Sequence, residues 1–273
     1  MFWLPFRRAL RNPVFCGGVE EFTRNPVRWS HGVNYLILLA IVLFIAWPKE
    51  GFLKLRDLPF TYVPLGVSVL GILAYINFSQ GSRKLLGSEY ISLRDWLSLA
   101  PLQGGVFLRG YLATGFLECV FFWGLSLPLL VLAAGVSGES LAHLGAGALL
   151  ILICVGSYRV IAVTLLLCCE RDEFLLYLMA RLLCVFFIVV SGFVLPVCNP
   201  VLAFVDSSIW HDPKRLAGVS FLGLTLPGGM VTGGLHLLLG GLFFIIASVR
   251  VRWIQHRTTR LFGTQKEGVG GGA

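Results

Sequence analysis

Two charged side chains lie deepest within the long apolar runs of the sequence. Glu118 belongs to the run 106–134, and Arg159 belongs to the run 141–169. Helices that rise about 1.5 Å per residue would hold both side chains at a depth of roughly 15–18 Å. An unpaired charge there costs at least ~2.5 kcal/mol, so the two are predicted to form an ion pair. The sequence leaves open whether this pair faces a transport pathway or subunit seam, or is a structural pair buried in the bundle.

A serine and a histidine offer a second chemistry. The segment GVSG, with Ser137 as its third residue, matches the GxSG of rhomboid intramembrane proteases, and His236 begins a later apolar run. A serine and histidine at one depth can form an activated nucleophile. The loop after the first apolar run lacks the long insertion of rhomboids, and the second run lacks their HxxxN. A protease is therefore the least favoured alternative, and no catalytic residue is predicted.

Other site chemistries are missing from the sequence. No phosphate-binding loop GxxxxGK[ST] occurs, so any ATP-driven motor must lie on another polypeptide. The seven cysteines form no CxxC pair, and the histidines show no metal-ligand spacing, so neither a metal nor a cofactor is predicted. Basic, aromatic-interleaved nucleic-acid motifs are also absent, so nucleic acid is not an expected partner.

The composition places these residues in a membrane protein. Of 273 residues, 56% are hydrophobic and only 13% are charged, whereas a soluble domain carries about 25% charged residues. Too little polar surface exists to cover a globule, so the lipid bilayer must cover it. The formal net charge of +8 then reflects basic loops on one side of the membrane.

Hydrophobic runs of about 20 residues predict an all-α membrane protein with six transmembrane helices in a single domain, 1–273. An amphipathic interfacial segment, 1–32, precedes the spans, and a flexible tail, 258–273, follows them. The broken apolar segment 199–229 is predicted to be re-entrant on the outer side, between the fifth and sixth spans. The predicted spans are 33–47, 62–78, 106–134, 141–169, 174–197 and 230–253.

The distribution of Lys and Arg gives the orientation. Most of the 22 basic residues fall on the side that holds both termini, which predicts cytosolic ends and an even number of spans. On that side, a charged amphipathic hook, 88–101, joins the second and third spans and ends at a proline. The hook residues predicted to couple the bundle to a soluble partner are Glu89, Arg94, Asp95, Trp96 and Pro101.

Three stretches resemble the permease subunits of type V ABC exporters, the ABC-2-like transporter family. They are SEYISLRDWLSLAPLQGGVFLRGYL, SLPLLVLAAGVSGESL and NPVLAFVDSSIW. The resemblance implies that the hook is a coupling helix, which docks into a separate cytosolic ABC ATPase, and that a second permease subunit completes the pathway as a homo- or heterodimer. The chain departs from the family in the hook, where Glu89 lacks the usual adjacent arginine.

The predicted function is therefore the membrane-spanning permease of an ATP-driven exporter in a bacterial cytoplasmic membrane. The alternative outside transport is a scaffold subunit of a larger membrane complex. The two are separated by whether changes in the hook alter the activity of an ATPase partner.

Overall fold

The computed structural model describes residues 12–48, 61–82, 103–168, 173–209, 219–221, 224–226 and 228–269. Within them, five helices are long and apolar enough to cross a membrane. They are α3 (Pro26–Ile45), α4 (Tyr62–Ser82), α6 (Gly104–Ser137), α7 (Leu141–Cys168) and α11 (Gly228–Val269), of which Gly228–His256 forms the candidate span. The chain is a multi-pass helical membrane protein.

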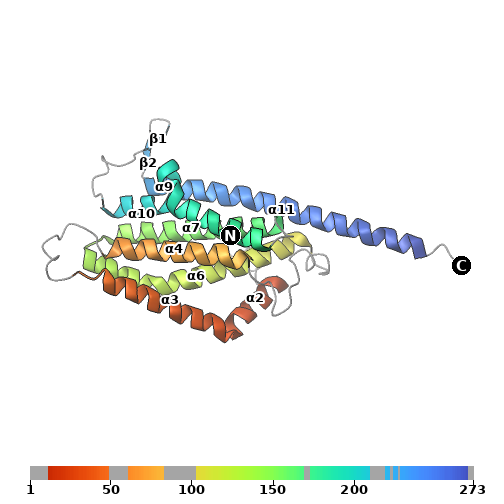
Figure 1. Cartoon of the computed structure of the whole chain (residues 1–273), viewed down its shortest axis with the longest axis horizontal. Helices are drawn as coiled ribbons and strands as arrows, with labels where there is room; N and C mark the ends of the chain where they lie inside the picture. Colours follow the sequence, from red (N-terminus) through yellow and green to blue (C-terminus); the bar gives the residue numbers. More distant parts are fainter. Residues whose placement is uncertain are drawn as a thin grey trace, which may run out of the picture.

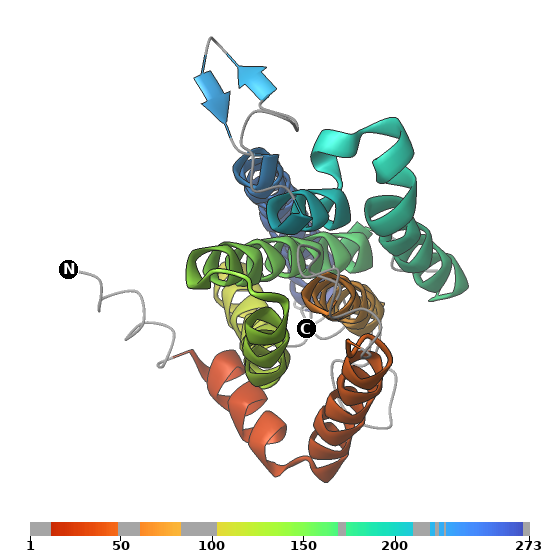
Figure 2. The same ribbon diagram turned by 90° about the vertical axis from the view of Figure 1, so that its left-hand side faces the viewer.

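The remaining described elements are short. They are α2 (Pro13–Arg24), α8 (Glu173–Val185), the π-helical turn η2 (Phe186–Val190), α9 (Ser191–Val194), the 3₁₀ turn η3 (Pro196–Cys198), α10 (Pro200–Ile209), β1 (Val219–Phe221) and β2 (Leu224–Leu226). The two strands form an antiparallel hairpin with Val219 opposite Leu226. This small hairpin lies outside the helical bundle (Figures 1 and 2).

The repeated Asn-Pro dipeptides start α2 and α3. The Asn12 side chain accepts hydrogen bonds from the backbone N–H groups of Val14 and Phe15, and Asn25 accepts one from Val27. Proline follows each asparagine at the first helical position, where its missing N–H has no cost. The two helices meet at Asn25 and form an elbow that stands out from the bundle like a V (Figure 2).

Helix α7 lies at the centre of the bundle and packs against α4, α6 and α11 (Figure 2). Its residues Ile151, Cys154 and Tyr158 are fully buried. Glycines permit a close approach of α10: a Cβ atom on Gly66 would lie 2.1 Å from a ring carbon of Phe204. The ring of Phe204 therefore packs directly on the backbone of α4 at Gly66 and holds the short helix α10 against α4.

The two ends of the bundle are defined by contacts between helix termini. At one end, the Tyr62 N–H donates to Ser137 Oγ, and Thr61 Oγ1 donates to the carbonyl of Ala46. At the other, which we call the base, the Asn12 amide donates to the carbonyl of Val106. Helix α6 begins at the base. Helix α11 begins at the opposite end and projects past the base (Figure 1).

The predicted fifth span is bent. The sequence predicts a span over 174–197 that is broken by Pro196 and Pro200. In the structure the helical run stops at Leu195, next to the first of these prolines, but helix α8 also passes through a π-helical turn, leaving an apolar stretch of Leu178–Val194. The break follows from Pro196, which lacks an N–H, and from Asn199, whose amide donates to the carbonyl of Ile188. This stretch is shorter than the five long helices.

The tail also differs from the prediction. The sequence predicts a flexible tail from residue 258, whereas α11 is helical to Val269. The glycine-rich end suggested irregular backbone, but the segment RTTRLFGTQKE before it contains mostly good helix formers. The predicted hook, with Glu89, Arg94, Asp95, Trp96 and Pro101, lies outside the described residues.

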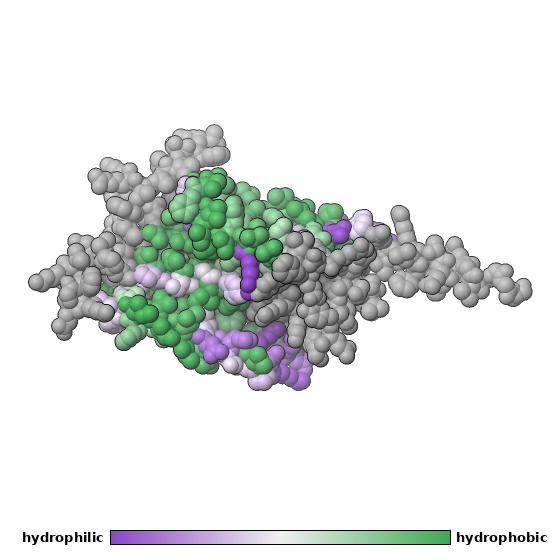
Figure 3. Space-filling model, viewed as in Figure 1, coloured by the Kyte–Doolittle hydropathy of each residue, from purple (hydrophilic) through white to green (hydrophobic). Residues whose placement is uncertain are grey.

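Hydrophobic side chains cover much of the visible bundle surface (Figure 3). Exposed large apolar residues include Phe44, Phe193 and Leu238, at 81%, 87% and 73% exposure, as a surface in lipid requires. Hydrophilic side chains gather over the elbow of α2 and α3 (Figure 3).

Candidate functional site

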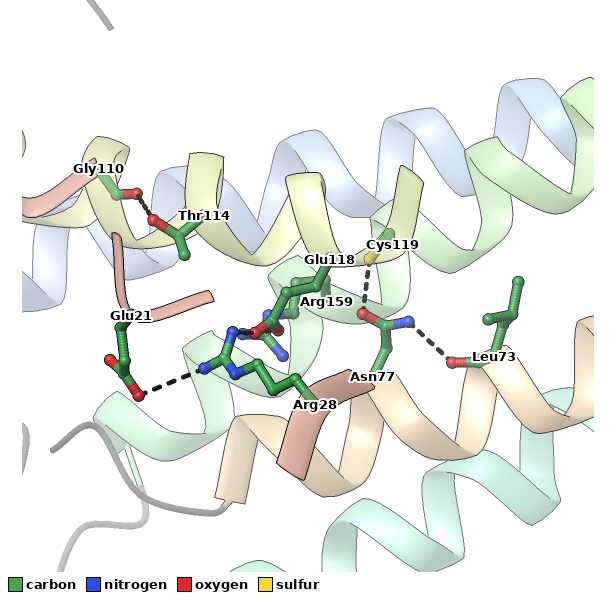
Figure 4. Close-up of polar contacts among 9 residues, drawn as sticks. All are labelled: Glu21, Arg28, Leu73, Asn77, Gly110, Thr114, Glu118, Cys119 and Arg159. Carbon is green, nitrogen blue, oxygen red and sulfur yellow. Dashed lines mark hydrogen bonds and ion pairs between the residues drawn. The ribbon is translucent and has the colours of Figure 1, made fainter. Parts of the chain in front are cut away.

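The predicted pair of Glu118 and Arg159 is brought together where α6 faces α7. Arg159 Nη2 lies 3.6 Å from Glu118 Oε2, and both side chains are about nine-tenths buried. A third residue completes the group: Arg28 Nη1 pairs with Glu118 Oε1 (Figure 4). One carboxylate therefore bridges two guanidinium groups that come from different helices.

Arg28 was missed by sequence reasoning, which placed it in the interfacial segment ahead of the first span. The structure starts α3 at Pro26, so Arg28 stands in the first turn of a membrane-spanning helix. A cation near a helix N-terminus is disfavoured by the helix dipole by about 0.3–1 kcal/mol. Glu118 compensates for that position. The one available signal in the sequence was the helix-starting Asn25-Pro26 pair.

The charges form a chain that runs from the surface into the bundle. Glu21 lies 3.5 Å from Arg28, which in turn contacts Glu118, and Glu118 contacts Arg159 (Figure 4). Side-chain exposure falls along this order, from 50% at Glu21 to 27%, 10% and 7%. We call these four residues the charge chain. It links the elbow to the centre of the bundle.

A glycine on α6 makes room for Arg159. A Cβ atom on Gly115 would lie 2.3 Å from Arg159 Nε, so any larger residue would displace the guanidinium. The ring of Tyr111, one turn earlier, lies 5.7 Å from the guanidinium carbon, within reach of a cation–π contact. Arg159 Nε and Nη1 are buried and have no hydrogen-bond partner among the described residues. Each such buried donor costs about 1–3 kcal/mol.

Three helices place the cluster at the same depth. Glu118 lies about 29 Å from the last residue of α6, Arg159 about 27 Å from the first residue of α7, and Arg28 about 26 Å from the last residue of α3. The hydrocarbon core is about 30 Å thick. A core of that thickness whose far face lies at these opposite helix ends would end close to the cluster, on the base side.

Helix α2 holds the elbow against the first turns of α6. A Cβ atom on Gly110 would lie 2.6 Å from Asn12 Oδ1, and one on Gly18 would lie 2.5 Å from Thr114 Oγ1. The two helices therefore approach closely through a glycine on each. Further along, the rings of Phe22 and Phe121 make an edge contact at 5.1 Å between centroids. These contacts fix the point from which Arg28 reaches Glu118.

A polar contact continues beyond the cluster toward α4. Cys119 Sγ, next to Glu118, donates to Asn77 Oδ1 at 2.7 Å, and the Asn77 amide donates to the carbonyl of Leu73 (Figure 4). All of these atoms are buried. The α6 turn that carries Glu118 is thus fixed to α4 as well as to α7.

Ser137 and His236 do not form a catalytic pair. Ser137 Oγ accepts the N–H of Tyr62 at the end of α6. Both ring nitrogens of His236 have other partners, since Nε2 lies 3.0 Å from the Tyr158 hydroxyl and Nδ1 lies 2.9 Å from the carbonyl of Thr232. A carbonyl only accepts, so Nδ1 carries the proton and Nε2 accepts from Tyr158. This arrangement serves packing between α7 and α11.

Comparison with protein-family models, with curated proteins and with solved structures finds no match to this chain. What the chain does must therefore be argued from its own residues. Within the described part, no group of three or more His, Cys, Asp or Glu residues forms a metal site.

Proposed function

We propose that the chain is the membrane-spanning permease subunit of an ATP-driven, ABC exporter-like complex. The permease lies in a bacterial cytoplasmic membrane with both termini in the cytosol, and a separate ATPase subunit supplies the energy. A second permease subunit, identical or different, shares the pathway. The proposal rests on the resemblance of three sequence stretches to type V exporter permeases and on the topology below.

The route of the chain is the observation that carries the proposal. Helix α7 ends at the base, and α11 begins at the opposite end, so the segment from α8 to α10 must return along the bundle. Contacts agree with this route: Arg181 of α8 donates to the Tyr75 hydroxyl, and Phe204 of α10 packs near the far end of α4. In this proposal the bent segment is the sixth crossing, and α10 is the re-entrant outer piece.

Six crossings put all the predicted coupling elements on one side. The segment that contains the hook, 83–102, joins α4, which ends at the base, to α6, which begins there. The basic residues Arg109, Arg250 and Arg252 of the described helices also lie there. The positive-inside rule makes the base cytosolic. A partner that moves the hook would therefore push on the lower turns of α6.

Helix α6 can carry such a displacement to the charge chain. Its first three turns lie beyond the hydrocarbon core, while Glu118 stands at the edge of that core. A shift of α6 would change the pairing of Glu118 with Arg28 of α3 and with Arg159 of α7. ATP binding at a distant site would then bias the bundle between two arrangements. In this role the cluster joins moving helices and is not itself a catalytic site.

The proposal is tested by purifying the tagged chain in mild detergent and identifying what co-purifies. A stoichiometric subunit with a phosphate-binding loop, whose ATPase activity the chain stimulates, is the expected result. Replacing Trp96 with alanine should then reduce that stimulation about tenfold, because an aromatic anchor contributes at least ~1–2 kcal/mol to docking. Trp47→Ala, at the opposite end of the bundle, is the matched control.

Two results would reject the transporter. A chain that purifies alone, or only with other membrane subunits, favours the scaffold. Equal ATPase stimulation by the Trp96 and Trp47 variants would mean that the hook does not couple the chain to the ATPase.

A further inference from the structure

We propose that Arg159 binds a phosphate-type oxyanion at the base-side edge of the hydrocarbon core, between α7 and the elbow of α2 and α3. The site is made by α6 and α7 and is covered from outside by Arg28. It does not depend on an ATPase partner, so it can be tested on the chain alone.

The donor inventory of Arg159 is the first observation. A guanidinium group carries five N–H donors in a planar fork. Nη2 lies 3.6 Å from Glu118 Oε2, which is an ion-pair distance and too long for a hydrogen bond. Nε and Nη1 have no acceptor among the described residues, although the side chain is only 7% exposed. Nη1 and Nη2 form the terminal fork of the guanidinium, which can hold an oxyanion in a bidentate manner because neither nitrogen makes a hydrogen bond to Glu118 through this fork.

The charge balance is the second observation. Arg28 makes the closest contact with Glu118, so the carboxylate is shared between two guanidinium groups. Glu21, the other carboxylate of the charge chain, is half-exposed and, within this chain of four residues, contacts Arg28 and not Arg159. The buried part of the cluster therefore carries one positive charge in excess. An anion beside Arg159 would neutralise it.

The depth of the cluster is the third observation. Arg28, Glu118 and Arg159 lie about 26–29 Å from the opposite ends of their helices, which is where lipid phosphates meet the hydrocarbon core. Trp29, the neighbour of Arg28 on α3, is about half exposed, as interfacial aromatic residues are. An oxyanion reaches this depth either on a lipid headgroup or as free phosphate from the water.

Gly115 shapes the site. The atoms nearest to a Cβ built there are Nε, Cζ and Nη2 of Arg159, so the Nε–Nη2 edge of the guanidinium faces the glycine, and Nη1 is not among these nearest atoms. Tyr111 contacts the guanidinium from the base side of Gly115. An anion would approach the guanidinium at Nη1, the nitrogen that neither the Glu118 ion pair nor Gly115 engages.

The test measures the melting temperature of the purified chain in neutral detergent. Three additions are compared: phosphatidylglycerol, diacylglycerol with the same acyl chains, and inorganic phosphate. We expect phosphatidylglycerol or inorganic phosphate to raise the melting temperature of the wild type by about 3 °C or more, and diacylglycerol to leave it unchanged. Arg159→Lys keeps the charge but removes the fork, and should lose this rise. Arg252→Lys, an exposed arginine on α11, should retain it.

A second variant is expected to change the anion-dependent rise in melting temperature in the opposite direction. The test therefore does not depend on whether the Arg159 variant folds well. Glu118→Gln removes the competing carboxylate and should enlarge the anion-dependent rise. A rise with phosphatidylglycerol alone identifies a lipid headgroup, and a rise with inorganic phosphate identifies a soluble source. The proposal is overturned if no addition raises the wild-type melting temperature, or if Arg159→Lys and Arg252→Lys respond equally.

Discussion

At the scale of single residues, Glu118 neutralises one buried cation, Arg159, and one partly buried cation, Arg28. Replacing it with glutamine leaves Arg28 and Arg159 facing each other without a carboxylate between them. Breaking a buried ion pair from one side costs about 3–5 kcal/mol, so Glu118→Gln should lower the melting temperature strongly in the absence of added anions. Thermal unfolding in detergent measures this loss.

The control for Glu118 is an ion pair in water. Arg24 pairs with Glu20 at 2.8 Å, but their side chains are 79% and 58% exposed. Exposed pairs contribute little because solvent screens them, so Arg24→Gln should leave the melting temperature almost unchanged. Equal losses for the two variants would mean that the Glu118 cluster is solvated and carries no special stability.

A second prediction at this scale adds a side-chain carbon to Gly115, next to Arg159. Gly115→Ala puts a Cβ 2.3 Å from Arg159 Nε and should destabilise the protein by about 1–3 kcal/mol. Gly124→Ala in the same helix meets nothing within 4 Å, so it should be neutral or stabilising because alanine favours the helix. Melting temperatures of the two variants make the comparison. A tolerated Gly115→Ala would show that the guanidinium is free to move.

At the scale of elements, the elbow is held to the bundle through α2. Gly17 and Gly18 are neighbours, yet only a Cβ on Gly18 would meet Thr114, at 2.5 Å. Gly18→Ala should therefore loosen α2 from α6 and increase hydrogen exchange over α2, whereas Gly17→Ala should not. Hydrogen exchange resolved by peptide measures the difference. If α2 is protected from hydrogen exchange equally in both variants, the close packing of Gly18 against Thr114 does not hold the elbow in place.

A second element, α10, depends on one aromatic side chain. Phe204 is fully buried against Gly66 and against Tyr62, whose ring centroid lies 5.2 Å away. Phe204→Ala should cost about 3–5 kcal/mol through lost contacts and the cavity left behind. Leu202→Ala, on a side chain that is 41% exposed, is the control and should cost far less. Thermal unfolding would show little difference if α10 were not docked.

At the scale of the whole molecule, the sequence predicted the long helices because hydrophobic length is a local property. The predicted span 141–169 matches α7 to within one residue, and 106–134 lies inside α6. The pairing of Glu118 with Arg28 could not be predicted from the sequence, because these residues are 90 positions apart. The break at Pro196 was predicted from the sequence, because proline cannot continue the hydrogen-bonding of a helix. The π-helical turn at Phe186–Val190 was not predicted, because an apolar run has the same composition whether its helix is regular or not.

The number of crossings is the prediction that belongs to the whole molecule. In a chain with its cysteines replaced, Ser140→Cys and Gln103→Cys introduce labels at the two ends of α6, and Met230→Cys introduces one at the start of α11. If α8 to α10 complete a sixth crossing, a membrane-impermeant maleimide added to intact cells should label positions 140 and 230 and leave 103 unlabelled until the membrane is opened. Met230 is 68% exposed, so its reactivity reports its side of the membrane and not its burial. If position 140 is labelled in intact cells and position 230 is not, the start of α11 lies on the base side of the membrane. The segment from α8 to α10 would then not cross the membrane.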